Sequence, residues 1–279
     1  MKTICVAGLG LIGGSMARTI KLHTEATVIG CDKNSQTIMQ AMLMGAIDQE
    51  YQPGDLARCD LVLVALYPRG IVEWIRAHAD EFRPGALVID CGGVKEQICR
   101  ELIPIARERG WYFIGGHPMA GRERWGFKYA RDDLFDNASM ILTPGGDEEL
   151  EVLQKARDFF MDLGFRRVQF TTPRTHDEMI AYTSQLAHVV SSAYVKCPRA
   201  GQHRGFSAGS FADMTRVARL AEDMWTELFF DNRDALLPEV EGLINRLAEY
   251  RDALRVGDRE AMRTLLREGR EIKEKLEEN

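Results

Sequence analysis

The first 172 residues alternate short, apolar, β-branched runs with amphipathic segments, and this alternation limits the folds open to the chain. Buried strands are predicted at 3–8, 26–31, 60–66, 86–90 and 111–115. The spacing of apolar residues in the segments between them predicts helices at 13–22, 34–45, 70–81 and 95–109. Strands that are apolar throughout and separated by helices indicate βαβ units in a parallel sheet with both faces covered.

Two more apolar runs, 138–143 and 166–172, flank a predicted helix at 147–163 and should extend the same sheet. Strand patterns then stop. A long buried helix is expected at 176–195, and helical spacing continues at 211–230, 233–254 and 258–279. We therefore expect an α/β fold in which a Rossmann-type, doubly wound parallel sheet (1–172) precedes an all-helical domain (173–279).

The composition excludes several classes of protein. A net charge of -6 argues against a protein that binds nucleic-acid backbones. No apolar run reaches the roughly 20 residues of a membrane span, and the N-terminus enters a strand pattern without the features of a signal peptide. Six cysteines without a C-x-x-C pair or a Cys/His cluster indicate free thiols and no metal site. A cytoplasmic protein is expected.

A glycine-rich turn follows the first predicted strand. Gly8, Gly10 and Gly13 have G-x-G-x-x-G spacing at the start of a βαβ unit, which is the context of a dinucleotide site. The first glycine allows the tight turn, the second lets a pyrophosphate approach, and the third lets the helix pack on the strand. The N-terminus of the following helix offers N–H groups to the phosphates. Glycines that serve only the turn are the alternative.

Asp32 ends the second predicted strand, where a carboxylate can accept hydrogen bonds from a ribose hydroxyl. The carboxylate would repel a 2′-phosphate, so NAD is favoured over NADP. The positive charge of Lys33, the next residue, weakens this preference. A turn or helix-cap role is the alternative. The remaining predicted cofactor contacts lie in the glycine turn and at the end of the strand at 60–66: Leu9, Leu11, Ile12, Leu66 and Pro68.

His117 stands in "GGHPMAG", just past the predicted strand at 111–115. Ligands of doubly wound sheets bind beyond the carboxyl ends of the strands, so this position suits a general base beside a nicotinamide. A histidine that closes a turn is the alternative. Lys95 also follows a strand end and could bind an anionic substrate; its alternative is a solvated lysine in the first turn of a helix, where the helix dipole is unfavourable.

Five stretches occur in the order found in one known family: "GLGLIGGS" (8–15), D-x-x-x-VK (90–95), "GHPMAGRERWG" (116–126), "HDEMIAYTSQLAH" (176–188) and "GSFADMTRVA" (209–218). In these stretches, which span the chain to about residue 230, it resembles the prephenate and arogenate dehydrogenases of tyrosine biosynthesis. The resemblance implies oxidative decarboxylation of prephenate with NAD, and a homodimer formed by the helical domain.

The resemblance also implies residue roles. His117 matches the histidine that accepts the proton of the C4 hydroxyl, Lys95 a lysine that interacts with the substrate, and Glu123 an acid near the mouth of the site. His188 would face the substrate side chain, and Arg216 would bind the ring carboxylate.

The assignments of Arg216 and His188 keep alternatives. Asp213, one turn before Arg216, would hold this partly buried arginine in place. A purely structural Asp213–Arg216 pair and a packed core histidine at 188 stay open. His176 and Asp177 are interpreted as a helix N-terminal feature.

The chain departs from the family pattern at several positions. Gly93 stands where the family usually has a serine that orients the hydroxyl and the histidine. The family's S-H-L-P-H is "SQLAH" here, and Arg122 replaces a small polar residue. No regulatory amino-acid-binding domain follows the helices before Asn279, so feedback control through such a domain is not expected. These differences affect substrate preference more than reaction type.

Three other functions remain open at this point. The first is oxidation of arogenate, which differs from prephenate by an amino group in place of a keto group. The second is a related two-domain hydroxy-acid dehydrogenase, although such enzymes use a lysine on the long helix and Lys196 lies only at its far end. The third is a nucleotide-binding sensor without turnover, which would not need both His117 and Arg216.

Overall fold

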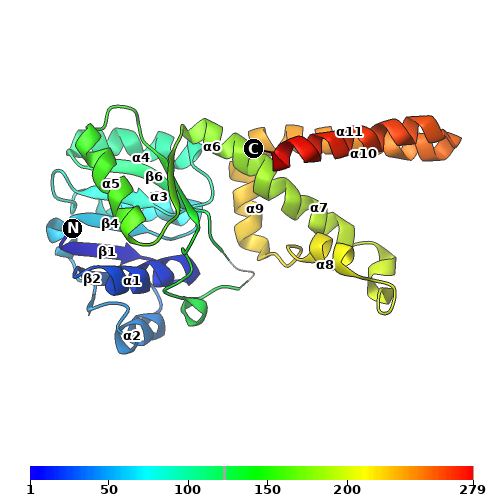
Figure 1. Ribbon diagram of the computed structural model, residues 1–279. Helices are drawn as coiled ribbons and strands as arrows, with labels where there is room; N and C mark the ends of the chain where they lie inside the picture. The colour runs from blue at the N-terminus through cyan, green and yellow to red at the C-terminus, as the bar shows by residue number, and fades with distance from the viewer. Residues whose placement is uncertain (122–123, 279) are drawn as a thin grey trace. The chain divides into compact units, whose positions relative to one another are not determined.

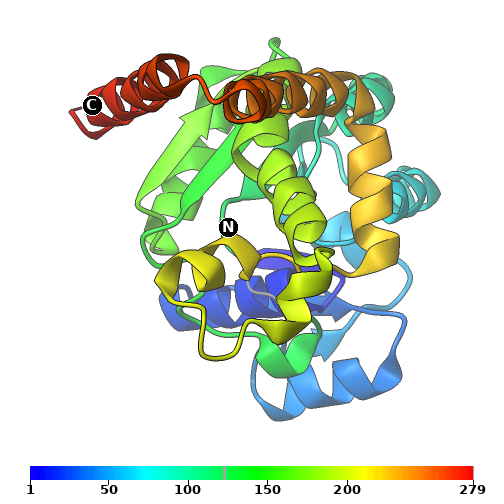
Figure 2. The same cartoon turned by 90° about the vertical axis from the view of Figure 1, so that its right-hand side faces the viewer.

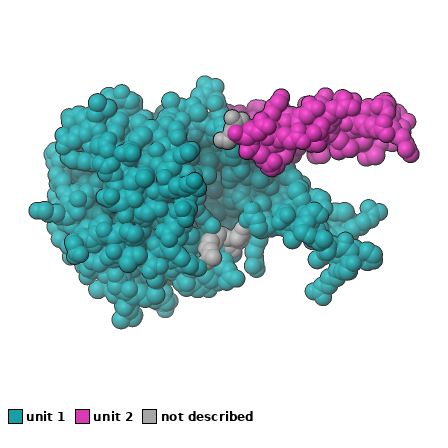
Figure 3. Space-filling model, in the orientation of Figure 1, with its two compact units in different colours: residues 1–232 teal, residues 233–279 magenta. Residues whose placement is uncertain are grey.

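A computed structural model describes residues 1–121 and 124–278 of the 279-residue chain. The chain divides into two compact units, Met1–Asn232 and Arg233–Asn279 (Figure 3). The first unit contains an eight-stranded sheet in the order β3-β2-β1-β4-β5-β6-β7-β8. Its strands are β1 Thr3–Ala7, β2 Thr27–Cys31, β3 Gln49–Glu50, β4 Leu61–Val64, β5 Leu87–Asp90, β6 Tyr112–Pro118, β7 Ser139–Thr143 and β8 Arg167–Phe170.

Strands β1 to β6 pair in parallel, as predicted, and the short β3 was not anticipated. The exception to the predicted parallel order is β7, which runs antiparallel to β6. A parallel neighbour requires a crossover, usually a helix. In the described residues between β6 and β7 there is only a 3₁₀ turn, Phe127–Tyr129, so the chain folds back directly. After α5, β8 pairs in parallel with β7.

Helices cover both faces of the sheet (Figure 1). One apolar core joins the sheet to α1, α2 and α5, and the other joins it to α3 and α4. Buried residues from alternate strand positions contribute to the two cores, such as Val6 to one and Cys5 to the other. The helices are α1 Leu11–His23, α2 Ser35–Leu43, α3 Pro68–His78, α4 Glu96–Arg109 and α5 Leu150–Asp162.

The long helix predicted at 176–195 has three parts: α6 Pro173–Ile180, a π-helical turn Ala181–Gln185, and α7 Leu186–Val195. The π turn was not predicted, and such turns are frequent at functional sites. The helix is also less buried than expected, since Tyr182 and Tyr194 are exposed.

The segment 211–230 is not one helix but two, α8 Gly209–Thr215 and α9 Glu222–Asp231. Ser191 of α7 donates a hydrogen bond to the carbonyl of Met214 at 2.8 Å, so α7 and α8 lie side by side (Figure 2).

The second unit consists of α10 Arg233–Val256 and α11 Arg259–Glu277. Asp258 caps α11 by accepting hydrogen bonds from the N–H groups of Glu260 and Ala261. The Tyr250 hydroxyl donates to the Leu265 carbonyl and ties the two helices together. Among the described residues, no helix of either unit combines the length and apolar character that a membrane crossing requires.

Candidate active site

The glycine turn between β1 and α1 has the shape of a dinucleotide site. Gly8 has a φ of +84°, and a Cβ there would lie 2.4 Å from the Ala65 carbonyl oxygen. A Cβ on Gly13 would lie 1.8 Å from the Gly8 oxygen, so both positions require glycine. A Cβ on Gly10 would meet nothing within 4 Å, which leaves the space that a pyrophosphate needs. Among the described residues, no side chain caps α1.

Asp32 is tied to this turn by its carboxylate. One oxygen accepts from the Leu9 N–H at 2.8 Å and the other from the Asn34 N–H at 2.9 Å. The cap of α2 is Asn34 and not Asp32, so the helix-cap alternative for Asp32 is wrong. A carboxylate has lone pairs beyond these two bonds and can still accept from a ribose hydroxyl.

The other predicted cofactor residues lie around the same turn. Leu9 is buried, Leu11 and Ile12 form the first turn of α1, and the Leu66 side chain approaches Gly8. Pro68 is the first residue of α3. All of them lie at the carboxyl ends of β1, β2 and β4, so the residues present fit a dinucleotide.

A buried ion pair lies at the end of β5. The Lys95 ammonium pairs with Asp90, and both side chains are 0% exposed. Asp90 also accepts from the N–H groups of Gly92 at 2.9 Å and Gly116 at 3.1 Å. Lys95 is therefore not the solvated lysine of the alternative interpretation. Its positive charge is paired with Asp90 in the protein interior, at the carboxyl end of β5.

His117 lies within β6, and not beyond its end as predicted. The strand pairs in parallel with β5 only up to Ile114, and then continues through Gly115–Pro118 as the antiparallel partner of β7, with His117 opposite Ile141. The strand is longer than its apolar run because β7 supplies hydrogen bonds to a segment that hydrophobicity alone does not mark. His117 still lies beyond the carboxyl end of β5.

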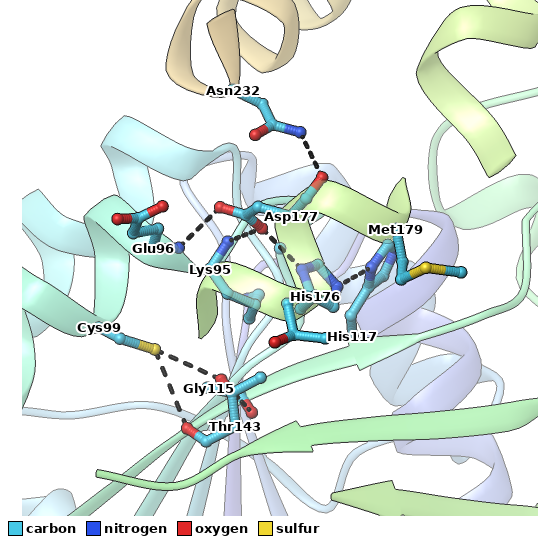
Figure 4. Close-up of polar contacts among 12 residues, drawn as sticks. Lys95, Glu96, Cys99, Gly115, His117, Thr143, His176, Asp177, Met179 and Asn232 are labelled. Carbon is cyan, nitrogen blue, oxygen red and sulfur yellow. Dashed lines mark hydrogen bonds and ion pairs between the residues drawn. The ribbon is translucent and has the colours of Figure 1, made fainter. Parts of the chain in front are cut away.

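His117 begins a chain of hydrogen bonds that crosses from the sheet to α6 (Figure 4). Its Nδ1 lies 2.8 Å from Nε2 of His176, whose Nδ1 lies 2.7 Å from a carboxylate oxygen of Asp177. The Asp177 carboxylate accepts from the N–H groups of Lys95 and Glu96, each at 2.8 Å. The chain thus links the candidate base to the N-terminus of α4.

Burial lowers the pKa of His117 well below its ordinary value, and the positive charges of protonated His176 and of Lys95 lower it further. Burial also lowers the pKa of His176, although its hydrogen bond to Asp177 acts in the opposite direction. Both imidazoles are therefore neutral at pH 7, and a neutral imidazole can act as a base.

The remaining predicted substrate residues lie on the helices. His188 of α7 is partly buried, its Nδ1 is 3.0 Å from the Val217 carbonyl oxygen, and its ring centre is 3.9 Å from that of Trp225. A Cβ on Gly93 would lie 3.2 Å from Leu228. Because Trp225 and Leu228 are three residues apart on α9, one face of this helix contacts both Gly93 and His188.

Asp213 lies in α8, and Arg216 follows the last residue of this helix. Both are exposed, so the expectation of a partly buried arginine is wrong; α8 is short and contributes no buried residue. The structure brings Val217, the neighbour of Arg216, to His188. Glu123, together with Arg122, lies outside the described residues.

Asp90 has no predicted role, although it begins the motif D-x-x-x-VK, and His176 and Asp177 were predicted to have only a local role at a helix start. Asp90 carries a signal, because it is the one charged residue in the run "ALVID". The pair at 176–177 lies 59 residues from His117, and only the fold shows that it faces β6.

Comparison with known proteins agrees with this arrangement. Residues 16–169 match the family model described as "Prephenate dehydrogenase, nucleotide-binding domain", and residues 172–268 match "Prephenate dehydrogenase, dimerization domain". The chain belongs to the prephenate dehydrogenase family. The resemblance inferred from the motifs and the predicted fold class are confirmed, and the chain is an oxidoreductase with a nucleotide-binding domain.

Three known proteins are similar to this chain over 92–100% of its length and over 71–99% of their own. Prephenate dehydrogenase from Bacillus subtilis is 27% identical over 92% of this chain and 71% of its own. The structure of prephenate dehydrogenase from A. aeolicus with hydroxyphenyl propionate and NAD+ is 27% identical, with a TM-score of 0.85 over 100% of this chain and 98% of its own. Synechocystis arogenate dehydrogenase is 26% identical, with a TM-score of 0.81 over 98% and 99%.

Proposed function

We propose that the chain catalyses the NAD-dependent oxidative decarboxylation of prephenate to 4-hydroxyphenylpyruvate. The observation that carries this proposal is His117, hydrogen bonded to His176 and with a lowered pKa, at the carboxyl ends of the strands of a sheet whose glycine turn fits a dinucleotide. Family membership supports the same reaction, and so does the relative whose structure contains NAD+ and a hydroxyphenyl compound.

The cofactor would be held by the glycine turn, by the N-terminus of α1 and by Asp32. NAD, when bound, accepts the hydride from C4 of the substrate. His117 accepts the proton of the C4 hydroxyl, and the ring loses carbon dioxide as it becomes aromatic. The protein has to orient the reactants and to bind the two carboxylates of the dianion.

Arg216 would bind the ring carboxylate, since a planar guanidinium can donate two hydrogen bonds to it. Asp213 would hold Arg216, His188 would face the side chain of the substrate, and Glu123 would lie at the mouth of the site. Lys95 is enclosed with Asp90. We therefore assign it an electrostatic effect on the site and not a direct contact.

Arogenate is the second candidate substrate, because the Synechocystis relative is named for it and is about as similar to this chain as the A. aeolicus relative that is named for prephenate. A hydroxy-acid dehydrogenase remains disfavoured, since Lys196 follows the last residue of α7 and is exposed.

The test is a side-by-side assay of prephenate and arogenate, each with NAD and with NADP. The proposal predicts the fastest NADH formation with prephenate and NAD. Faster turnover of arogenate would establish the second candidate. No turnover of either compound, with NAD binding intact, would refute both and favour a nucleotide-binding sensor.

Asp32→Asn is expected to raise the use of NADP relative to NAD. The amide keeps an acceptor oxygen but removes the charge that repels a 2′-phosphate, and a tenfold change in the ratio of kcat/KM corresponds to about 1.4 kcal/mol. The control is Asp60→Asn, whose carboxylate accepts the backbone N–H groups of Lys2 and Thr3 at the amino ends of β1 and β4, away from the glycine turn. An unchanged cofactor ratio in Asp32→Asn would exclude Asp32 from the ribose site.

We further propose that residues 1–172 bind the cofactor, that residues 173–279 complete the substrate site, and that the chain acts as a cytoplasmic homodimer. The match to a dimerization domain supports the dimer. So do exposed apolar residues of α10, among them Ile244, Leu247 and Leu254. Light scattering should give twice the chain mass of 31.5 kDa; a monomer at micromolar concentration would contradict the dimer.

A further inference from the structure

The hydrogen-bonded chain from His117 to Asp177 contains two side chains that the proposed mechanism does not use. His176 and Asp177 are each 2% exposed, although histidine and aspartate are rarely buried without a reason. Within the described residues, His176 is the side chain that hydrogen bonds to His117. Figure 4 shows the three side chains in a row between β6 and α6.

Asp177 is fixed from several directions. Its two carboxylate oxygens receive the N–H groups of Lys95 and Glu96, at the start of α4, where the helix dipole favours a negative charge. Its backbone carbonyl accepts from the Asn232 side chain at 2.9 Å, and Asn232 also donates to Gln185 at 2.7 Å. The carboxylate therefore has little freedom to turn away from His176.

The position of each proton follows from this arrangement. A carboxylate only accepts hydrogen bonds, so Nδ1 of His176 carries the proton that it donates to Asp177. In a neutral His176 the other nitrogen, Nε2, must then be an acceptor. The 2.8 Å contact is consequently a hydrogen bond donated by Nδ1–H of His117. This leaves Nε2 of His117 as the nitrogen with the free lone pair.

We propose that His176, held by Asp177, is a positioning residue that keeps His117 in the tautomer whose Nε2 can accept the hydroxyl proton. The inference rests on the proposed function. When Nε2 takes the proton, His117 becomes a cation that still donates through Nδ1 to His176. The negative charge of Asp177, on the far side of the His176 ring, stabilises this cation. The proton remains on His117 until it leaves to solvent.

The test compares His176→Leu with His176→Gln. Leucine fills the space but accepts no hydrogen bond, whereas the glutamine amide can present its oxygen to His117 and its NH₂ group to Asp177. We expect His176→Leu to lower kcat by about 10²–10⁴-fold, the range of a lost general base, with the KM for prephenate and the affinity for NAD within about threefold. His176→Gln should retain at least about tenfold more activity than His176→Leu.

The pH profile separates positioning from a structural role. His117 contacts His176 of α6, and the charge of Lys95 also acts on it. The charged groups that act on His176 are Asp177, Lys95 and Asp90. In the proposed arrangement Nδ1–H of His117 donates to residue 176, so His176→Leu removes the acceptor that stabilises protonated His117 and should move the acid limb of kcat/KM to lower pH, whereas His176→Gln keeps an acceptor oxygen and should leave the limb near its wild-type position. The matched control is His78→Leu and His78→Gln, a histidine of α3 whose Nδ1 contacts the Trp74 carbonyl.

Three results would overturn the inference: wild-type kcat in His176→Leu, equal losses in both variants, or an acid limb in His176→Leu that does not move to lower pH. If His176→Leu does not fold, His176→Gln alone decides, and a kcat lowered by more than about 10³-fold in this variant refutes the proposal. Turnover of prephenate by the wild-type chain keeps the proposed function intact in each of these cases. Its absence would refute that function instead.

Discussion

His117→Asn is expected to lower kcat with prephenate by about 10²–10⁴-fold, which is the usual contribution of a general base. Asparagine keeps a hydrogen-bonding group near His176 but cannot accept a proton at neutral pH. NAD affinity should stay within about twofold, because the glycine turn and Asp32 lie at other strands. Assays of NADH formation measure kcat, and a fluorescence titration with NAD measures the affinity for NAD.

His203→Asn is the control for this substitution, since the partly buried side chain of His203 hydrogen bonds to Ser207 and stacks on Phe211. Normal turnover in His117→Asn would refute the assigned role. The pH profile adds a second check. The base must be neutral, and burial lowers its pKa. Activity of the wild-type chain should therefore stay constant as the pH falls to about 6.5 and decline only below that value.

Lys95→Met is expected to lower the free energy of unfolding by about 3–5 kcal/mol, because it leaves the Asp90 carboxylate buried without its partner. Denaturation in urea, followed by circular dichroism, measures the change. The control is Lys155→Met, whose exposed ion pair with Glu151 on α5 should contribute nothing measurable.

A double variant makes this test more specific. Asp90→Asn combined with Lys95→Met removes both charges and keeps an acceptor for the N–H groups of Gly92 and Gly116. It should be more stable than Lys95→Met alone, since no unpaired charge remains. A loss below about 1 kcal/mol in Lys95→Met, or a double variant as unstable as the single one, would contradict the account of the buried pair.

The parallel part of the sheet was predictable because its strands are buried on both faces and therefore apolar throughout. The antiparallel direction of β7 was not predictable, because it depends on a connection without a crossover helix. The apolar pattern of Ser139–Thr143 is equally compatible with a parallel and an antiparallel strand. The break between α8 and α9 was also missed. The apolar spacing continues through Arg216–Ala221, although these residues leave the helix.

The candidate site could be predicted where a local pattern carries the chemistry, as it does for Gly8, Gly10, Gly13 and His117. The partners of His117 could not be predicted, since a histidine and an aspartate at a helix start also have an ordinary local explanation. The burial of Lys95 escaped prediction for a similar reason. Its partner Asp90 ends a strand, and only the fold shows that the two side chains turn toward each other.

The most direct test of the central claim is a crystal structure of the His117→Asn variant with NAD and prephenate bound. The account predicts that the side chain at position 117 lies within about 2.6–3.2 Å of the C4 hydroxyl, next to the nicotinamide. It also predicts that Arg216 donates two hydrogen bonds to the ring carboxylate of the same molecule. A substrate bound away from β6, or an Arg216 guanidinium that contacts no part of it, would contradict the account.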